Sequence, residues 1–137
     1  MNGPSEHLSW KELACNDGTP YPPEWRISRA IPLAEVFEII RHACGDKPIK
    51  VISAYRTYTH NLRVGGAKHS QHLQGRALDL VPPNGYSVDE FYDIIKGLSE
   101  STLIRGIGKY ETFVHVDIRP MDKLVIWHSS LFKESRA

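Results

Sequence analysis

The chain has 137 residues, of which 41% are hydrophobic and 24% are charged, and its 17 basic and 16 acidic residues leave a formal net charge of +1. This length and apolar fraction are typical of one globular domain and exclude a disordered or low-complexity chain. The near-neutral charge disfavours a nucleic-acid-binding protein, because such proteins carry an excess of Lys and Arg. We expect no membrane span, since no apolar run approaches ~18 residues, and no signal peptide, since residues 1–10 lack a basic start and an apolar stretch.

Two cysteines and seven histidines bear on metal chemistry. Cys15 and Cys44 are far apart in the sequence and neither forms a CxxC pair, which excludes a thiolate zinc site and a thioredoxin-like motif. We expect two separate thiols, buried or partly exposed, rather than a disulfide, because no secretion signal is present. Any metal should therefore be bound by His and carboxylate side chains.

The first part of the chain predicts two helices joined by an irregular segment. Residues 9–12 have the Ser-x-x-Glu spacing of a capping box, which predicts a short helix. Residues 21–25 contain two prolines and should lie on the surface, with Trp25 buried. Pro32 begins a longer helix that ends at Gly45. Its apolar stripe, at helical spacing, consists of Leu33, Val36, Phe37, Ile40 and Ala43.

The rest of the chain predicts five strands and a further helix. One strand is expected over Pro48–Ala54, and residues 55–74 have no sustained period, so we expect a long irregular loop, which is usually functional. A second strand is expected over 76–81, and a second helix follows the capping box of Ser87 and Glu90. Three more strands are expected over Leu103–Ile107, Thr112–Ile118 and Leu124–Trp127. The pattern indicates an α+β domain whose helices cover one face of a small, mostly antiparallel sheet.

The stretch most informative for function is residues 70–79, which has His72 before the second predicted strand and Asp79 within it. On that strand Leu78 and Leu80 should face the core, which leaves Asp79 on the opposite face. An ionised carboxylate among apolar residues needs a partner, because burying it alone is very costly. A capped turn or an Arg pair is the alternative, but Asp is a poor residue for the middle of a strand.

A second stretch, residues 113–119, places His115 and Asp117 on one face of a strand, because both alternate with β-branched residues. Opposite a His and an Asp from another strand, this pair can form a metal site. Zinc accepts His nitrogen and Asp oxygen, and a catalytic zinc site has three protein ligands and one open position. A satisfied His–Asp pair at the surface explains the same pattern without a metal.

Taken together, these motifs resemble the zinc D-alanyl-D-alanine carboxypeptidase family, which includes peptidoglycan-cleaving metallopeptidases and phage endolysins. The pattern Ser-x-His-x-x-Gly-x-Ala-x-Asp over 70–79 is similar to the family signature, and 113–117 resembles its C-terminal motif. Upstream, 53–57, 60–61 and 64–67 follow in the same order as in the family. The likeness implies the hedgehog/DD-peptidase fold and one catalytic domain over 1–137, without a separate cell-wall-binding domain.

The resemblance also implies a role for each matching position. The three zinc ligands would be His72, Asp79 and His115. Arg56 matches an arginine that binds the terminal carboxylate of the substrate, which suits the two-pronged guanidinium; an ordinary exposed arginine is the alternative. Ser70 and Gln71 would line the approach to the metal and bind substrate or support a ligand.

The sequence departs from the family pattern where the general base is expected. Many members carry an acidic general base three residues before the third ligand, and others carry a His two residues before it; here these positions are Thr112 and Phe113. The carboxylates expected on the same strand face as His115 are Asp117 and Glu111. We expect Asp117 to be the base because it is nearer, and a supporting or Arg-paired carboxylate is the alternative role.

The resemblance thus implies a zinc-dependent peptidase that hydrolyses peptide bonds of peptidoglycan stem peptides, as a D-alanine carboxypeptidase or as an endopeptidase. The alternative is a catalytically inactive, zinc-stabilised binding or structural domain of the same fold. We expect a monomer whose partner is peptidoglycan, with neither nucleic acid nor a membrane bound. Cytoplasmic synthesis, action on the cell wall and a phage or prophage origin fit the lack of a signal peptide.

Overall fold

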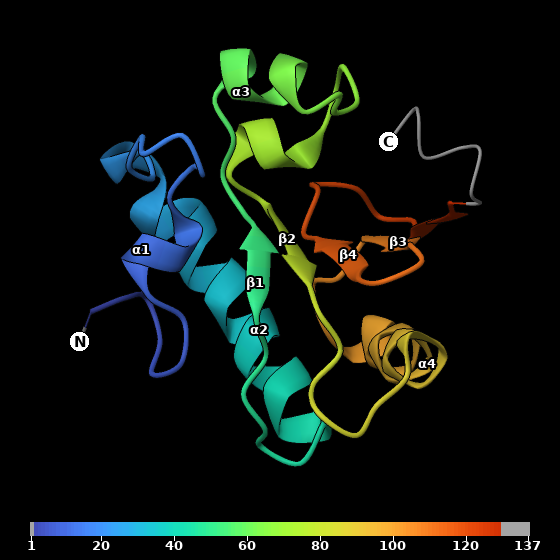
Figure 1. Ribbon diagram of the computed structural model, residues 1–137. Coiled ribbons are helices and arrows are strands. Elements are labelled where there is room, and N and C mark those ends of the chain that lie inside the picture. Colours follow the sequence, from blue (N-terminus) through green and yellow to red (C-terminus); the bar gives the residue numbers. More distant parts are fainter. Residues whose placement is uncertain (1, 130–137) are drawn as a thin grey trace.

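A five-stranded sheet forms the centre of the computed structural model, which describes residues 2–129 (Figure 1). Its strands are β1 (Val51–Ser53), β2 (Ala77–Leu80), β3 (Gly106–Lys109), β4 (Val114–Asp117) and β5 (Val125–His128). They lie in the order β1-β2-β4-β3-β5, and all neighbours are antiparallel except the parallel pair β3 and β5. The predicted α+β class is confirmed.

Helices and short helical turns connect these strands. The α-helices are α1 (Trp10–Leu13), α2 (Ile31–Ala43), α3 (Tyr58–Arg63) and α4 (Val88–Leu98). The shorter turns are η1 (Pro23–Trp25), η2 (Arg26–Ala30), η3 (Gln71–Gln74) and η4 (Ser99–Ser101). Both predicted capping boxes are present, at the start of α1 and of α4, where each Ser side chain and the Glu three residues later satisfy backbone N–H groups.

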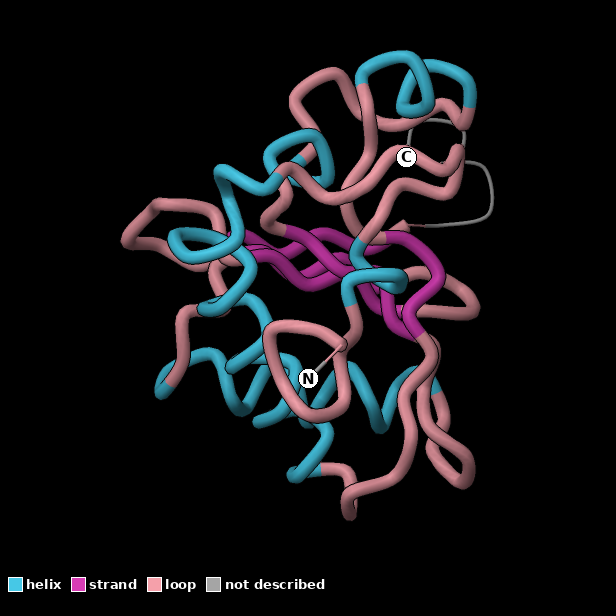
Figure 2. Tube along the Cα trace, turned by 90° about the vertical axis from the view of Figure 1, so that its left-hand side faces the viewer, coloured by secondary structure: helices cyan, strands magenta, loops and turns pink. Residues whose placement is uncertain are grey.

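One face of the sheet is covered by the longer helices, and the other, called the loop face, by loops and short helical segments (Figure 2). On the helical side α2 contacts α4, and α4 contacts β3 and β4. The buried core includes Phe37 of α2, Leu78 and Leu80 of β2, and Val114 and Val116 of β4. Because side chains alternate along a strand, the polar residues between these positions point to the loop face. The fold therefore brings Asp79 and His115 to the same side of the sheet.

The structure differs from the sequence prediction in several places, and β1 begins at Val51 rather than at residue 48. Residues 55–74 are not wholly irregular, because they contain α3 and η3; α3 has only six residues and is too short to show an apolar stripe. Trp25 is only half-buried, and the buried aromatic residue of that segment is Tyr21, whose hydroxyl donates to the backbone oxygen of Gly75 at 2.7 Å. The third strand begins at Gly106 rather than at residue 103.

Other expectations hold within the described residues. Cys15 and Cys44 are free, as predicted, and both are buried. Gly45 follows the end of α2 with φ +78, the left-handed conformation that favours glycine. Between residues 2 and 129, no helix combines the length and the apolar character needed to cross a membrane.

Candidate metal centre

One row of paired residues runs across all five strands. Ser53 in β1 pairs with Asp79 in β2, Asp79 with His115 in β4, His115 with Gly108 in β3, and Gly108 with Trp127 in β5. Directly paired residues have their side chains close together on one face of a sheet. The row therefore places the predicted Asp and His ligands side by side. Gly108 leaves space for the indole, because a Cβ there would lie 2.5 Å from Nε1 of Trp127.

His72 joins this row from η3, the short turn just before β2. Ser70 caps the turn by accepting a hydrogen bond from the His72 N–H at 3.1 Å, and Gly75 ends it with φ +65. The Nδ1 of His72 lies 2.6 Å from the backbone oxygen of Ala54, and its Nε2 lies 3.0 Å from Oδ1 of Asp79. Because a carbonyl oxygen can only accept, Nδ1 carries the proton and Nε2 presents a lone pair.

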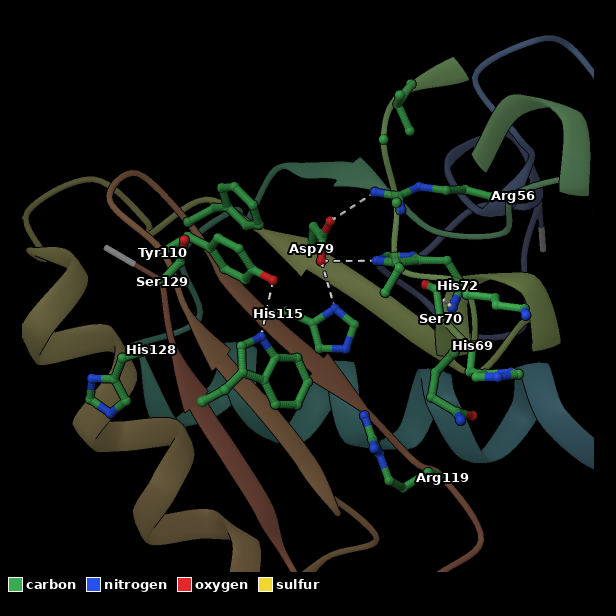
Figure 3. A pocket seen from close by; sticks show the side chains of 18 residues that line it. Arg56, His69, Ser70, His72, Asp79, Tyr110, His115, Arg119, His128 and Ser129 are labelled. Atoms are coloured by element: carbon green, nitrogen blue, oxygen red, sulfur yellow. Dashed lines mark hydrogen bonds and ion pairs between the residues drawn. The ribbon is translucent and has the colours of Figure 1, made fainter. Parts of the chain in front are cut away.

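His115 faces the same oxygen from the other side (Figure 3). Its Nδ1 lies 2.9 Å from Oδ1 of Asp79, and its Nε2 lies 2.7 Å from Oδ2 of Asp117. A carboxylate that accepts from Nε2 holds a proton there and leaves Nδ1 available as a ligand. Both imidazoles thus have one nitrogen held by an acceptor and the other directed at Asp79.

Asp117 is fully enclosed beside His115 and does not line the cavity that opens over the cluster. Arg119 holds its carboxylate with two hydrogen bonds of 2.8 Å, one from Nε and one from Nη2. Gly106, its partner in β3, leaves the space for this carboxylate, because a Cβ at that position would clash with it. Of the two roles weighed from the sequence, this geometry fits the supporting, Arg-paired carboxylate.

Burial and ion pairing set the charges of this cluster in the metal-free protein. Burial would raise the pKa of Asp79, but His72 and His115 outweigh it and hold that pKa well below its usual range. Burial lowers the pKa of His72, so its imidazole is neutral. Burial also opposes a charge on His115, yet hydrogen bonds to Asp117 and Asp79 prevail and raise its pKa to about 9. At neutral pH the cluster thus contains one neutral imidazole and one imidazolium.

Arg56 lies on the other side of Asp79. Its Nε donates to Oγ of Ser53 at 3.0 Å, its Nη1 donates to Oδ1 of Asn61 at 3.1 Å, and its Nη2 lies 3.5 Å from Oδ2 of Asp79. A guanidinium has five N–H groups, and contacts with the described residues use three of them. Arg56 therefore has donors left for a carboxylate that enters the site.

A cavity of about 650 Å³ opens over the cluster. Its wall includes six of the predicted site residues: Arg56, Ser70, Gln71, His72, Asp79 and His115. Gln71 contributes a buried Oε1 that has no hydrogen-bond partner among the described residues. Glu111 is exposed and does not line the cavity. Among the described residues, Asp79 is thus the one carboxylate in the cavity wall.

Three aromatic residues of this wall were not predicted from the sequence. The Nε1 of Trp127 donates to the hydroxyl of Tyr110 at 3.0 Å, and the Tyr110 and Phe113 rings stack with centroids 4.5 Å apart. No sequence motif predicts these three residues. The Gly-x-Gly pattern of β3 indicates only that larger side chains from the neighbouring strands occupy the space beside its glycines.

The cluster fits a metal ion. His72, Asp79 and His115 each offer a ligand atom, and the three atoms lie within 4.8 Å of one another. Two imidazole nitrogens and one carboxylate oxygen are a donor set typical of zinc, and three protein ligands leave one coordination position open. The second nitrogen of each imidazole is already held by the backbone or by Asp117, as in known zinc sites.

Comparisons with known proteins agree with this geometry. A family model described as peptidase M15 matches residues 6–117, which include all three ligand positions. The chain belongs to the peptidase M15 family. A curated relative, the zinc D-Ala-D-Ala carboxypeptidase of Streptomyces albus G, is 46% identical over 55 residues. That alignment covers 39% of this chain and 22% of the relative, so the chain spans less than a quarter of the relative's length.

Proposed function

We propose that this chain is a zinc-dependent peptidase that hydrolyses peptide bonds of peptidoglycan stem peptides next to D-alanine. The observation that carries the proposal is the convergence of His72, Asp79 and His115 beside a cavity in a member of the peptidase M15 family. The name of the Streptomyces relative supports the choice of bond. We further propose that the domain acts on the cell wall, as a carboxypeptidase or as an endopeptidase.

The ligands would be Nε2 of His72, a carboxylate oxygen of Asp79 and Nδ1 of His115. A bound zinc ion polarises a scissile carbonyl and lowers the pKa of a coordinated water toward ~7. The chain itself keeps the ligand atoms in place: the backbone oxygen of Ala54 orients one imidazole and Asp117 orients the other. Loss of such a supporting contact typically lowers metal affinity roughly 10- to 100-fold.

Substrate recognition would depend on Arg56 and Gln71. The remaining N–H groups of Arg56 suit the carboxylate of a terminal D-alanine, because a guanidinium binds a carboxylate through two parallel hydrogen bonds. The buried Oε1 of Gln71 suits a peptide N–H of the substrate, since a buried acceptor without a partner is unfavourable. Together the two residues would fix the position of the peptide relative to the metal.

The proton acceptor of the proposed reaction must be a side chain of the cavity wall. Neither Asp117 nor Glu111, the two carboxylates expected from the sequence, lines the cavity wall. We therefore propose that Asp117 is a positioning residue for His115 and that Glu111 takes no part in catalysis. Apart from the proposed ligands and the arginines, the titratable side chains in the cavity wall are Lys68, His69, Tyr110 and His128.

A catalytically inactive zinc-binding domain is the second candidate. It is favoured by one observation: within the described residues, the only carboxylate of the cavity wall is Asp79, which is itself a proposed ligand. Peptidases of this chemistry need a group that takes a proton from the attacking water. A domain without one would bind cell-wall peptides and leave them intact.

One experiment separates the two candidates. Zinc-loaded wild-type protein is incubated with purified muropeptides, and the products are identified by mass spectrometry. Peptidase activity predicts either the loss of a single D-alanine or the division of a cross-linked dimer, and the product masses distinguish these. Intact muropeptides in the presence of fully zinc-loaded protein would support the inactive binding domain instead.

A further inference from the structure

A second group of metal-binding side chains lies outside the proposed zinc centre. Cys15, Asp17 and His60 each offer one ligand atom, and these three atoms lie within 4.8 Å of one another. Cys15 is buried, His60 is half-buried and Asp17 is exposed. None of the three lines the cavity of the first centre. The group joins the turn after α1 to α3, two segments that are far apart in the sequence.

Hydrogen bonds already fix the two halves of this group. In the turn, Cys15 N–H donates to the Thr19 backbone oxygen at 2.8 Å, and Thr19 N–H donates to Oδ1 of Asp17 at 2.9 Å. The Thr57 hydroxyl, which caps α3, donates to Oδ2 of Asp17 at 3.0 Å and accepts from the His60 N–H at 3.1 Å. The ligand atoms are thus held close together before any ion arrives, which lowers the entropic cost of binding.

One nitrogen of His60 has no hydrogen-bond partner among the described residues. The Nδ1 of His60 is buried and makes no hydrogen bond to any described residue. A buried imidazole nitrogen without a partner is uncommon in native proteins, because its desolvation is not compensated. A metal ion bound at Nδ1 would remove this cost.

We propose that Cys15, Asp17 and His60 form a second transition-metal site that takes Zn²⁺, contrary to the sequence expectation that any metal is bound by His and carboxylate side chains alone. A thiolate and an imidazole favour Zn²⁺ over Mg²⁺ or Ca²⁺, which prefer oxygen ligands. A thiolate and a carboxylate together balance the two charges of the ion. The exposed side of Asp17 gives water access to a fourth position, as tetrahedral zinc requires.

The site would act as a cross-link rather than as a catalyst. It would connect the residue 15–19 turn to α3, whose capping residue Thr57 directly follows Arg56 in the chain. A metal at this position would therefore hold the segment that carries the proposed substrate-binding arginine. The proposal concerns a separate group of ligands and stands whether or not the first centre is a peptidase.

Cobalt substitution tests this site separately from the first centre. Only a site with a thiolate ligand gives a thiolate-to-cobalt band, and the first centre contains no sulfur ligand. Metal-free wild-type protein is titrated with Co²⁺, and the thiolate-to-cobalt charge-transfer band in the near ultraviolet is recorded. We expect the band in wild type and in His115→Ala, which lacks a ligand of the first centre. We expect no band in Cys15→Ser, and at least tenfold weaker binding at this site in His60→Gln. Cys44→Ala is the matched control, because it removes the other buried thiol and should keep the band.

Zinc content gives a second, independent readout. Wild type should bind two zinc ions per chain, and Cys15→Ser, His60→Gln and His115→Ala should each bind one. Circular dichroism establishes that each variant is folded; if Cys15→Ser does not fold, His60→Gln and the wild-type stoichiometry decide. A wild type with no thiolate band, or with one zinc ion that His60→Gln retains and His115→Ala loses, would overturn the proposal.

Discussion

Oδ1 of Asp79 lies 2.9 Å from Nδ1 of His115, and the two residues are direct cross-strand partners in β2 and β4. Cross-strand register thus fixes two of the three proposed ligands, and η3 supplies His72 directly before β2. A slip of one residue in this pairing would send one of the two side chains to the core face. The metal centre therefore depends on the register of the sheet.

Replacing Asp117 by Asn should weaken zinc binding without removing a ligand. The carboxylate holds Nε2 of His115, and loss of such a supporting partner typically lowers metal affinity roughly 10- to 100-fold. The measurement is a competition titration with a fluorescent zinc chelator. Glu111→Gln is the matched control, since Glu111 is exposed and outside the cavity, and its affinity and turnover should equal those of wild type. Equal effects of both substitutions would contradict the role given to Asp117.

Zinc affinity of the first centre should rise with pH. The pKa of His115 in the metal-free protein is raised to about 9, so below that pH its imidazole holds a proton that zinc must displace. The apparent affinity should increase by up to tenfold per pH unit from pH 7 and level off above about 9. Calorimetry in two buffers of different protonation enthalpy should show proton release at pH 7, in a Cys15→Ser background that isolates this centre. A flat affinity between pH 7 and 9 would exclude a protonated His115.

Gly108→Ala should destabilise the protein and displace Trp127. The added methyl group would lie 2.5 Å from Nε1 of the indole, and overpacking of this kind costs about 1–3 kcal/mol. Urea unfolding measures the change, and tryptophan fluorescence reports on the indole. Gly97→Ala is the control: its Cβ would meet nothing within 4 Å inside α4, so it should stabilise by about 0.4–1 kcal/mol. A neutral Gly108→Ala would contradict the described packing.

Arg56→Lys should impair cleavage of substrates with a free terminal carboxylate. Lysine keeps the charge but loses the two-pronged geometry, and charge-assisted hydrogen bonds contribute about 1.5–3 kcal/mol, which corresponds to roughly tenfold or more in kcat/KM. Steady-state kinetics on a stem peptide measures the effect, and the same peptide with an amidated C-terminus is the control. If both peptides lose activity equally, Arg56 acts on the metal ligands rather than on the substrate.

Strand alternation in the sequence predicted the side of the sheet on which Asp79 and His115 lie, whereas His72 lies in η3 and its role was implied only by the family resemblance. Leu78 and Leu80 flank Asp79, and Val114 and Val116 flank His115, so their faces follow from the period alone. The Cys15 and His60 group could not be predicted in this way. Its members come from a turn and a short helix, and only the tertiary structure brings them together.

The role of Asp117 shows a second limit of the sequence. Alternation places it on the face of His115, but does not tell whether the carboxylate meets solvent or another side chain. Arg119 and the space above Gly106 decide this, since together they enclose Asp117 and hold it against His115. Such pairing depends on packing between β3 and β4 and on the residue that follows β4, rather than on a local pattern.

The most direct test of the central claim compares wild type and His115→Ala on a D-alanine-terminated muropeptide. Turnover and zinc content are measured on the same preparations, after circular dichroism has established that both are folded. The account predicts cleavage by wild type, no detectable cleavage by His115→Ala, and one zinc ion fewer per chain in the variant. Full activity of His115→Ala, or a wild type that binds no zinc, would contradict it.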